Sequence, residues 1–270
     1  MSTRKRTTYD YVVAIPSYKR AEILKKKSLA VLQQYKIEPS RIFIFVANKE
    51  EEKEYKSILD RKTYNKIVVG VPKIGPQRIF ISEYFPVGKP LVQMDDDISS
   101  FIEWSPSAKR NEVELKDLKA VIKRGFDECK KANCSLWGIY PIANGYFMKK
   151  GHTTDLRFII GIFHGCFNPG TKGPKGIKHT IELHKEDYER TLLFYIRDGA
   201  VIRLSDVAPK TSYYTEKGGN EEFRKLKEFG AGAKLLVDKY PHLCSMNTRR
   251  KSGYPEIRLR DTRKNTIKHT

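Results

Sequence analysis

The segment Pro90-Leu-Val-Gln-Met-Asp-Asp-Asp97 carries the pattern that decides the fold, a short apolar run followed at once by three aspartates. An apolar run of this length is typical of a buried β-strand. Three adjacent carboxylates repel one another, and each is stabilised by a nearby cation. The segment therefore predicts a strand that ends at a polar site, and the simpler alternative is a solvated acidic turn.

The residues before this segment alternate between strand and helix patterns. Strands are predicted at 11–15, 41–47, 66–71 and 90–94, and helices at 21–35, 50–59 and 77–84. This order predicts an α/β fold with a Rossmann-like, mostly parallel sheet. Ligands bind at the carboxyl ends of strands in such sheets. Pro16 and Ser17 should therefore meet the three aspartates there, although about 80 residues separate them.

The residues after the aspartates show a mixed pattern. Helices are predicted at 111–131, 186–197 and 220–229, strands at 135–140, 157–163 and 200–204, and a flexible loop at 168–176. We expect one core over residues 1–205, followed by a basic C-terminal region over residues 206–270.

The charge of the chain points to polyanionic partners. Lys and Arg number 52 against 32 Asp and Glu, which gives a net charge of +20. Such an excess favours nucleic acid, anionic membranes or phosphorylated substrates. No apolar run reaches the roughly 18 residues of a membrane-spanning helix, so no transmembrane helix is expected. Of the three classes, we expect a nucleic acid and a nucleotide substrate and no membrane as partners. The four cysteines match no zinc motif and predict free thiols in a reducing compartment, the cytoplasm or, in a eukaryotic cell, the nucleus.

Asp95 and Asp97 are the first candidates for a metal site. On an extended segment, residues i and i+2 point to the same side, so these two carboxylates are expected to face one ion. Hard oxygen ligands suit Mg²⁺ or Mn²⁺, which keep water ligands and also bind substrate phosphates. A metal at this position would neutralise a departing phosphate group.

Three motifs occur in a fixed order: Pro16-Ser-Tyr-Lys-Arg20, Gly75-Pro-Gln-Arg78 and Leu91-Val-Gln-Met-Asp-Asp-Asp97. This ordered set resembles the donor half of the family 2 glycosyltransferases, which have the GT-A fold, and the resemblance spans roughly residues 9–205. It implies a metal-dependent, inverting transfer from a UDP-sugar. Residues 9–97 would form the nucleotide-sugar half and residues 98–205 the acceptor half.

The same resemblance implies a donor site and a metal site. The nucleotide-sugar would contact Pro16, Ser17, Arg20, Gln77, Arg78, Asp95 and Asp96. Arg78 would bind the diphosphate, since a guanidinium suits phosphate oxygens. Some GT-A enzymes use a late histidine as a further metal ligand, which makes His242 the candidate beside Asp95 and Asp97; an ordinary surface histidine is the alternative.

The pair Glu186-Asp187 is similar to the Glu-Asp acceptor motif of that family. The resemblance implies that Asp187 is the base that takes the proton of the acceptor hydroxyl, with Glu186 as the second choice. A pair of acidic residues that complements the dipole at a helix start is the alternative.

A narrower resemblance concerns the acceptor. The segments Ile15-Pro-Ser-Tyr-Lys-Arg20, Lys73-Ile-Gly-Pro-Gln-Arg78 and Met94-Asp-Asp-Asp-Ile98 resemble the TET-associated glycosyltransferases, which have phage and eukaryotic members and are related to the enzymes that glucosylate hydroxymethyluracil in kinetoplastid DNA. This resemblance implies that the acceptor is a 5-hydroxymethylpyrimidine in DNA.

Basic and aromatic residues provide candidates for DNA contacts. Phosphates would be neutralised by Arg249, Arg250, Lys251, Arg258, Arg260, Arg263, Lys264 and Lys268, and by Lys172, Lys175 and Lys178 in the flexible loop. Tyr213, Tyr214 or the segment 163–167 could stack on a flipped base, and Trp104 and Trp137 on a sugar or base, although a place in the core is the simpler expectation for each.

Two other functions stay open at the level of the sequence. One is the same enzyme class with a glycan, lipid or protein acceptor; an enzyme with a small acceptor would not need a net charge of +20. The other is a non-catalytic nucleic-acid-binding protein, which would not need the three aspartates opposite Arg78.

Overall fold

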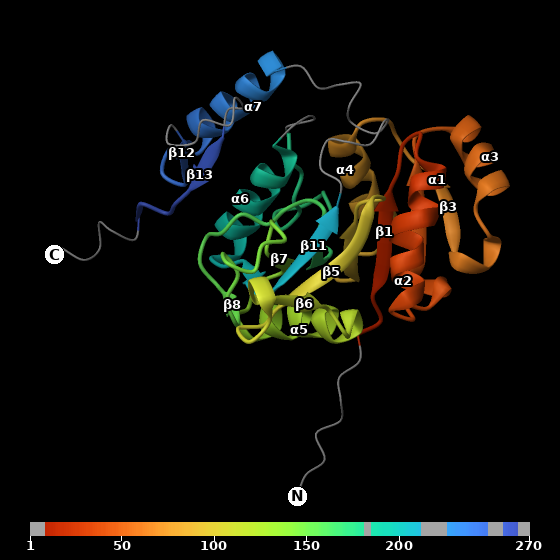
Figure 1. Ribbon diagram of the computed structural model, residues 1–270. Coiled ribbons are helices and arrows are strands. Elements are labelled where there is room, and N and C mark those ends of the chain that lie inside the picture. The colour runs from red at the N-terminus through yellow and green to blue at the C-terminus, as the bar shows by residue number, and fades with distance from the viewer. Residues whose placement is uncertain (1–8, 181–184, 212–225, 248–255, 264–270) are drawn as a thin grey trace, which may run out of the picture.

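The computed structural model describes residues 9–180, 185–211, 226–247 and 256–263. Its centre is an eight-stranded sheet in the order β3-β2-β1-β4-β9-β7-β10-β8 (Figure 1). The strands are β1 Val12–Pro16, β2 Ile42–Val46, β3 Lys66–Val69, β4 Pro90–Met94, β7 Leu136–Ile139, β8 His152–Thr153, β9 Phe163–Phe167 and β10 Ile202–Leu204. All run parallel except β8 and β9. The α/β fold class with a mostly parallel sheet is confirmed.

Helices cover both faces of this sheet. They are α1 Ala21–Leu24, α2 Ala30–Gln34, α3 Lys49–Ile58, α4 Ile74–Tyr84, α5 Leu118–Lys131, α6 Glu186–Asp198 and α7 Leu226–Lys239, and a π-helical turn, Lys25–Leu29, joins α1 to α2. Alternate residues of β1 enter different apolar clusters: Val13 packs with α1, α2 and α5, whereas Ala14 packs with α4 and α6. Both faces of β1 are therefore buried, as its apolar run requires.

Two smaller sheets complete the described fold. One contains β5 Ile98–Trp104, β6 Glu112–Glu114 and β11 Val207–Thr211 in the order β11-β5-β6, and the other pairs β12 Cys244–Met246 with β13 Ile257–Leu259. Because β11 pairs with β5, the first residues of the predicted basic C-terminal region are integrated into the core. Figure 1 shows α7, β12 and β13 together on the outer side of α6.

Several predicted elements need correction. The helix expected at 111–131 begins only at Leu118, because the Asp117 carboxylate accepts from the Ala120 amide and caps it there, while Glu112–Glu114 forms β6. The strand expected at 157–163 begins at Phe163, and residues 157–162 run irregularly beside the cavity described below. Most of the helix expected at 220–229 lies outside the described residues, within which α7 begins at Leu226.

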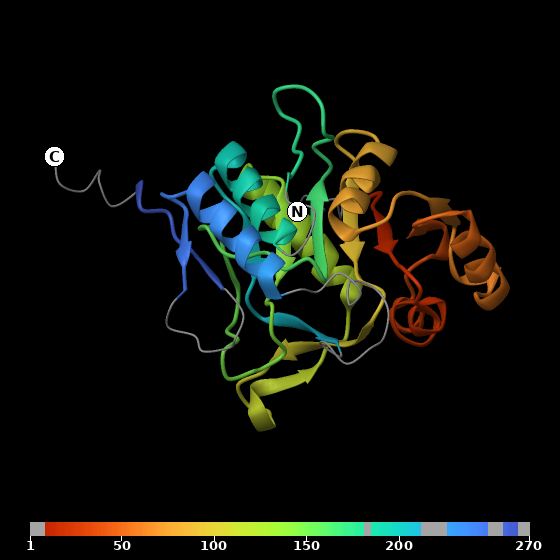
Figure 2. The same cartoon turned by 90° about the horizontal axis from the view of Figure 1, so that it is seen from above.

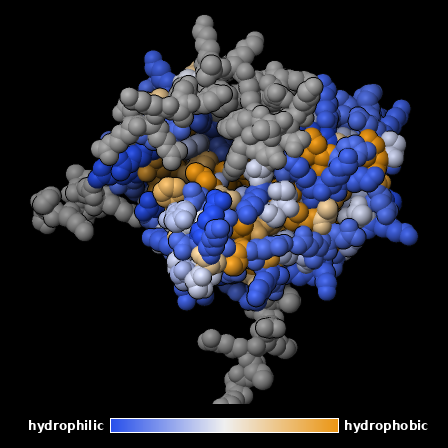
Figure 3. Space-filling model, in the orientation of Figure 1, coloured by the Kyte–Doolittle hydropathy of each residue, from blue (hydrophilic) through white to orange (hydrophobic). Residues whose placement is uncertain are grey.

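Figure 3 shows a face on which hydrophilic side chains predominate, with hydrophobic side chains gathered across its middle. All four cysteines are buried and free, as predicted. Within the described ranges, no helix is long and apolar enough to cross a membrane.

Candidate active site

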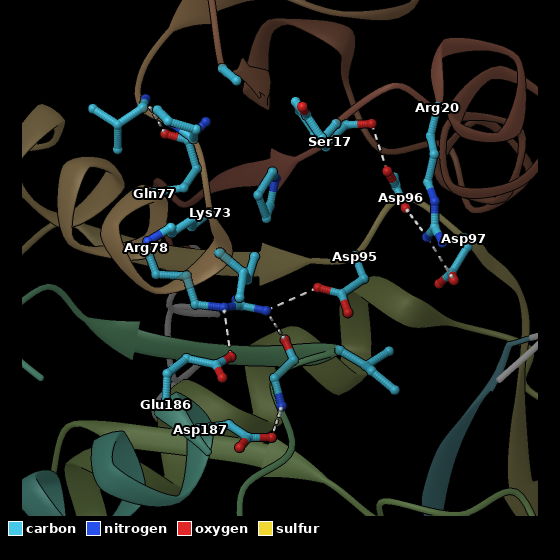
Figure 4. Close-up of a pocket in the computed structure, with 18 of the residues that line it drawn as sticks. Ser17, Arg20, Lys73, Gln77, Arg78, Asp95, Asp96, Asp97, Glu186 and Asp187 are labelled. Carbon is cyan, nitrogen blue, oxygen red and sulfur yellow. Dashed lines mark hydrogen bonds and ion pairs between the residues drawn. The ribbon is translucent and has the colours of Figure 1, made fainter. Parts of the chain in front are cut away.

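A cavity of about 310 Å³ opens at the carboxyl ends of β1 and β4. Pro16, Ser17 and Arg20 reach it from the turn after β1, Asp95 to Asp97 from the turn after β4, and Glu186 and Asp187 from the first turn of α6. The structure thus brings together residues that lie far apart in the sequence, at the edge of the sheet where a ligand is expected. Figure 4 shows their side chains around the cavity.

Asp96 is the most deeply buried of the three aspartates and ties β4 to the turn after β1. The Ser17 hydroxyl donates to Asp96 Oδ2 at 2.6 Å, and Arg20 Nη1 lies 3.4 Å from Asp96 Oδ1. Burial raises the pKa of Asp96 to about 7, although Arg20 and the bond from Ser17 act in the opposite direction. Asp96 therefore holds the wall of the cavity together.

The turn after β1 is positioned by α3. The Tyr55 hydroxyl lies 2.8 Å from Ser17 Oγ and accepts from the Arg20 amide at 3.0 Å. Glu51 accepts from the amides of Lys19 and Ala47, both at 2.8 Å. These bonds fix a turn in which Lys19 has a φ of 54°.

Asp95 and Asp97 turn toward different partners. Asp95 accepts from Arg78 Nη2 at 2.9 Å, whereas Asp97 accepts from the Thr211 hydroxyl at 2.9 Å and lies 3.4 Å from Arg20 Nη1 (Figure 4). The expectation of a continuous extended segment was wrong: β4 ends at Met94 and a turn follows. The Ser28 hydroxyl closes that turn by donating to the Asp95 carbonyl and accepting from the Ile98 amide.

Arg78 is the central cation of the site. It projects from α4, is only 3% exposed, and donates to Gln93 Oε1, Asp95 Oδ1 and the Gly161 carbonyl at 2.9–3.0 Å. Its Nε also lies 3.6 Å from Glu186 Oε1. Arg78 therefore joins α4, β4, the irregular segment and α6 at one point.

Gln77 is next to Arg78 in α4 but has a structural role. Its Oε1 accepts from the Val71 amide at 3.0 Å, and its Nε2 donates to the Val46 carbonyl at 3.2 Å. Gly70 makes room for it, since a Cβ atom there would lie 2.1 Å from Gln77 Oε1. The Gln77 side-chain amide is thus bonded to the protein's own backbone. Its predicted role in nucleotide binding would then be to support the cavity wall that the nucleotide contacts.

Asp187 faces the cavity from the opposite side to Ser17. Its Oδ1 accepts from the Tyr188 amide at 2.9 Å, and its Oδ2 lies 3.4 Å from the Gly161 amide (Figure 4). Burial, followed by repulsion from Glu186, raises the pKa of Asp187 to about 6. A carboxylate with such a pKa is a suitable proton acceptor near neutral pH.

His242 does not reach this site. It is exposed in the turn between α7 and β12, where its backbone carbonyl accepts from Thr262. Figure 1 shows this turn on the far side of α6 from β4. In the described part of the chain, no three His, Cys, Asp or Glu side chains are grouped to hold a metal. The prediction of His242 as a ligand rested on its distance along the chain, which does not determine its place in the fold.

The donor set nevertheless fits a divalent cation bound jointly with a phosphate. Five carboxyl groups and three cationic side chains line the cavity, an excess of two negative charges when all five carboxyl groups are ionised. Burial raises the pKa of Asp95 as well, even though Arg78 opposes the shift. Mg²⁺ is commonly held by one or two carboxylates, with waters and substrate phosphates completing its shell. Asp95 and Asp97 both line the cavity, so they would be the two carboxylates that hold such an ion.

Sequence reasoning missed several residues of the site. Lys73 and Thr211 line the cavity, and Gly161 lies against Arg78, where a Cβ atom would come within 3.0 Å of Nη2. Lys73 has a φ of 68°, which is rare outside glycine and marks a specially shaped turn. Thr211 lies at the end of an unpredicted strand, and no local pattern marked it.

The residues predicted to stack on a base or sugar are mostly packed in the core. Trp137 is fully buried, and its ring fills the space above Gly125 and Gly165, which leave no room for a side chain. Phe163 is also fully buried. Trp104 packs against Ile102 and Met148. Tyr213, Tyr214 and much of the basic tail lie outside the described residues.

Comparisons with known proteins give remote structural likenesses only. No protein-family model and no curated protein matches the sequence. Residues 1–349 of TarS from S. aureus in complex with UDP are similar with a TM-score of 0.47 and 13% identity over 84% of this chain and 65% of that one. A 4-diphosphocytidyl-2C-methyl-D-erythritol synthase from Anaerococcus prevotii is similar with a TM-score of 0.43 and 12% identity over 84% and 96% of the two chains. This chain spans 40% of a longer TarS structure.

Proposed function

We propose that this protein is a GT-A-type glycosyltransferase that transfers a sugar from a UDP-sugar. The observation that supports this proposal best is the convergence of Arg78, the aspartates of the β4 turn and Asp187 on one cavity. A buried carboxylate with a raised pKa that shares a cavity with a guanidinium and an acidic turn favours an enzyme over a non-catalytic binding protein.

We call the part of the cavity wall formed by Ser17, Arg20 and Arg78 the donor side, because the UDP-sugar is proposed to bind there. The Arg78 guanidinium would bind the diphosphate, for which its planar, permanently charged group is suited. Asp95 and Asp97 would hold Mg²⁺ or Mn²⁺, which when bound stabilises negative charge on the departing diphosphate. Because Arg78 is already bonded to Asp95, a diphosphate would share this guanidinium with the carboxylate.

The acceptor side is the side of Asp187. The acceptor hydroxyl oxygen attacks the anomeric carbon, its proton passes to Asp187, and the bond from that carbon to the diphosphate oxygen breaks with its electron pair on UDP. Asp187 lies across the cavity from Ser17 and Arg20 (Figure 4). Together with the resemblance to the family 2 glycosyltransferases, this placement supports our proposal of direct displacement with inversion at the anomeric carbon. Glu186 contacts Arg78, which makes it the less suitable base.

We propose DNA that carries a 5-hydroxymethylpyrimidine as the acceptor. The net charge of +20 supports a polyanionic acceptor, and Lys172, Lys175, Lys178, Arg258 and Arg260 are exposed or partly exposed cations among the described residues. The basic C-terminal region over residues 206–270 would complete the acceptor site. A glycan, lipid or protein acceptor is the alternative.

Calorimetric titration with UDP tests the donor assignment. UDP should bind more tightly with Mn²⁺ than with EDTA, and Asp97→Asn should remove the effect of Mn²⁺. Glu22→Gln, an exposed change on α1, is the matched control that should leave both titrations unaltered. Absence of UDP binding under both conditions would exclude the proposed donor.

A further inference from the structure

Two large aromatic side chains are held out from the protein in the loop between β7 and β8. Tyr146 is 68% exposed and Phe147 is 67% exposed, yet Met148, the next residue, is 4% exposed. Met148 packs into a small cluster with Ile102 and Ala208 from β5 and β11. The loop is therefore anchored directly beside the two exposed rings.

The turn between β5 and β6 supports this loop from the other side. Gly145 lies so close that a Cβ atom would be 2.2 Å from the carbonyl oxygen of Arg110 and 2.6 Å from that of Asn111. The Gly145 amide also donates to Glu112 Oε2 at 3.2 Å. Figure 2 shows the β5–β6 hairpin projecting from the body of the molecule. Both rings are thus presented on a fixed backbone.

Four exposed cations accompany the two rings, and we define the aromatic-basic patch as Lys109, Arg110, Tyr146, Phe147, Lys149 and Lys150. No ion pair joins any of its four cations to another described residue. Arg110 has a φ of 64° and is followed by Asn111 with a φ of 57°. A left-handed backbone conformation is unfavourable for a residue other than glycine and is retained most often where it serves a function.

The segment from Ser205 to Thr211, which includes β11, connects the aromatic-basic patch to the cavity. The Lys149 amide donates to the Ser205 carbonyl at 3.1 Å, and at the other end of this segment Thr211 donates to Asp97 at 2.9 Å. The steps from residue 205 to residue 211 span at most roughly 20 Å of extended chain. A strand of a duplex rises about 3.4 Å per nucleotide and an unpaired strand can extend further, so at most roughly six nucleotides would bridge the two places.

We propose that the aromatic-basic patch binds an unpaired stretch of the nucleic-acid acceptor, with bases stacked on Tyr146 and Phe147 and phosphates beside the four cations. Only an unpaired base offers a free ring face for stacking on an aromatic side chain. Aromatic side chains and Arg are also common at protein–protein interfaces, but three of the four cations are lysines, which are depleted there, so the concentrated positive charge favours nucleic acid over a protein partner. The identity of this patch as an acceptor site rests on the proposed function.

Fluorescence anisotropy with a labelled unpaired oligonucleotide tests the proposal in the absence of any donor. Tyr146→Ala with Phe147→Ala should weaken binding by about 10-fold or more, which is the scale of lost base–aromatic stacking. Tyr146→Trp with Phe147→Trp should retain it. Val87→Ala, at a 75% exposed position before β4, is the control and should change nothing. Lys149→Gln with Lys150→Gln should reduce the slope of log K against log salt by about 1.4.

The outcomes separate this proposal from the proposed function. Unchanged binding of the unpaired oligonucleotide by the double alanine variant would overturn the patch, as would an equal loss for duplex DNA. A change of oligomeric state in that variant, seen by light scattering, would overturn it in favour of a protein interface. If the stacking-dependent loss is seen while the wild-type protein binds no UDP, the patch stands and the proposed glycosyltransferase fails.

Discussion

Arg78 Nη2 lies 2.9 Å from Asp95 Oδ1, and both groups belong to the wall of one cavity. Arg78 comes from α4 and Asp95 from the turn after β4, so this pair locks the helix to the end of the strand. The same guanidinium lies 3.6 Å from Glu186 in α6. A single cation thereby connects the proposed donor side to the helix that carries the proposed base.

Replacing Arg78 by Ala should reduce both donor affinity and stability. UDP binding should weaken by about 1.5–3 kcal/mol, the scale of a hydrogen bond to a charged group. Unfolding should become easier as well, because Asp95 and Glu186 would lose a buried counter-charge. Calorimetry and thermal melting measure the two effects. Arg78→Lys keeps the charge but lacks the planar guanidinium, and equal donor affinity in that variant would show that the charge alone is sufficient for the diphosphate.

Replacing Asp187 by Asn should lower turnover by about 10²–10⁴-fold, because the amide cannot accept the acceptor proton. UDP affinity should change little, since the Asp187 carboxylate accepts from the Tyr188 and Gly161 amides and not from Ser17, Arg20 or Arg78. Asp238→Asn, at an exposed position on α7, serves as the control for a lost carboxylate. Full activity in the Asp187→Asn variant would mean that Asp187 is not the base, and Glu186 would then be the remaining candidate of the pair.

The pH dependence follows from the same carboxyl group. Burial raises the pKa of Asp187 to about 6, above its ordinary value of 3.8, so the carboxyl is increasingly protonated as the pH falls through 6. Only the ionised form can take a proton, and transfer should therefore decline below about pH 6 and level off above about pH 7. A pH profile of kcat measures this limb. A rate that stays constant down to pH 4.5 would rule out Asp187 as the base.

The metal site should depend on the aspartates and not on the late histidine. Asp97→Asn should abolish activation by Mn²⁺, whereas His242→Ala should leave it intact, because His242 is exposed and the turn between α7 and β12 that carries it lies beyond α6 (Figure 1). Titration of activity with Mn²⁺ compares the two variants. An effect of equal size in both would mean that the chain around His242 reaches the cavity.

The order of strands and helices up to Asp97 was predictable because each element carries its own signal. Apolar runs marked β1 to β4, and Asp95 to Asp97 followed from the position of β4. Signals of this kind are local, and they failed where contacts between distant segments decide the structure. β11 exists because it pairs with β5, and Thr211 enters the cavity only through that pairing. Distance along the chain placed His242 wrongly for the same reason.

The assignment of Tyr146 and Phe147 shows a further limit of sequence reasoning. Nothing in their local pattern distinguishes them from core aromatics such as Phe163, which is fully buried. Their exposure results from Gly145 and Met148, which are fixed by the β5–β6 hairpin and by β11. Only the folded chain shows which aromatic side chains are presented to a partner.

Intact mass measurement of DNA tests the central claim most directly. Unpaired and duplex oligonucleotides, each with and without a 5-hydroxymethylpyrimidine, would be incubated with the protein, Mn²⁺ and a panel of UDP-sugars. We predict that only the hydroxymethylated strands gain the mass of one sugar, and that Asp187→Asn prevents the gain. Hydroxymethylated DNA that gains no mass with any UDP-sugar, while a glycan or protein acceptor is modified, would contradict the proposed acceptor.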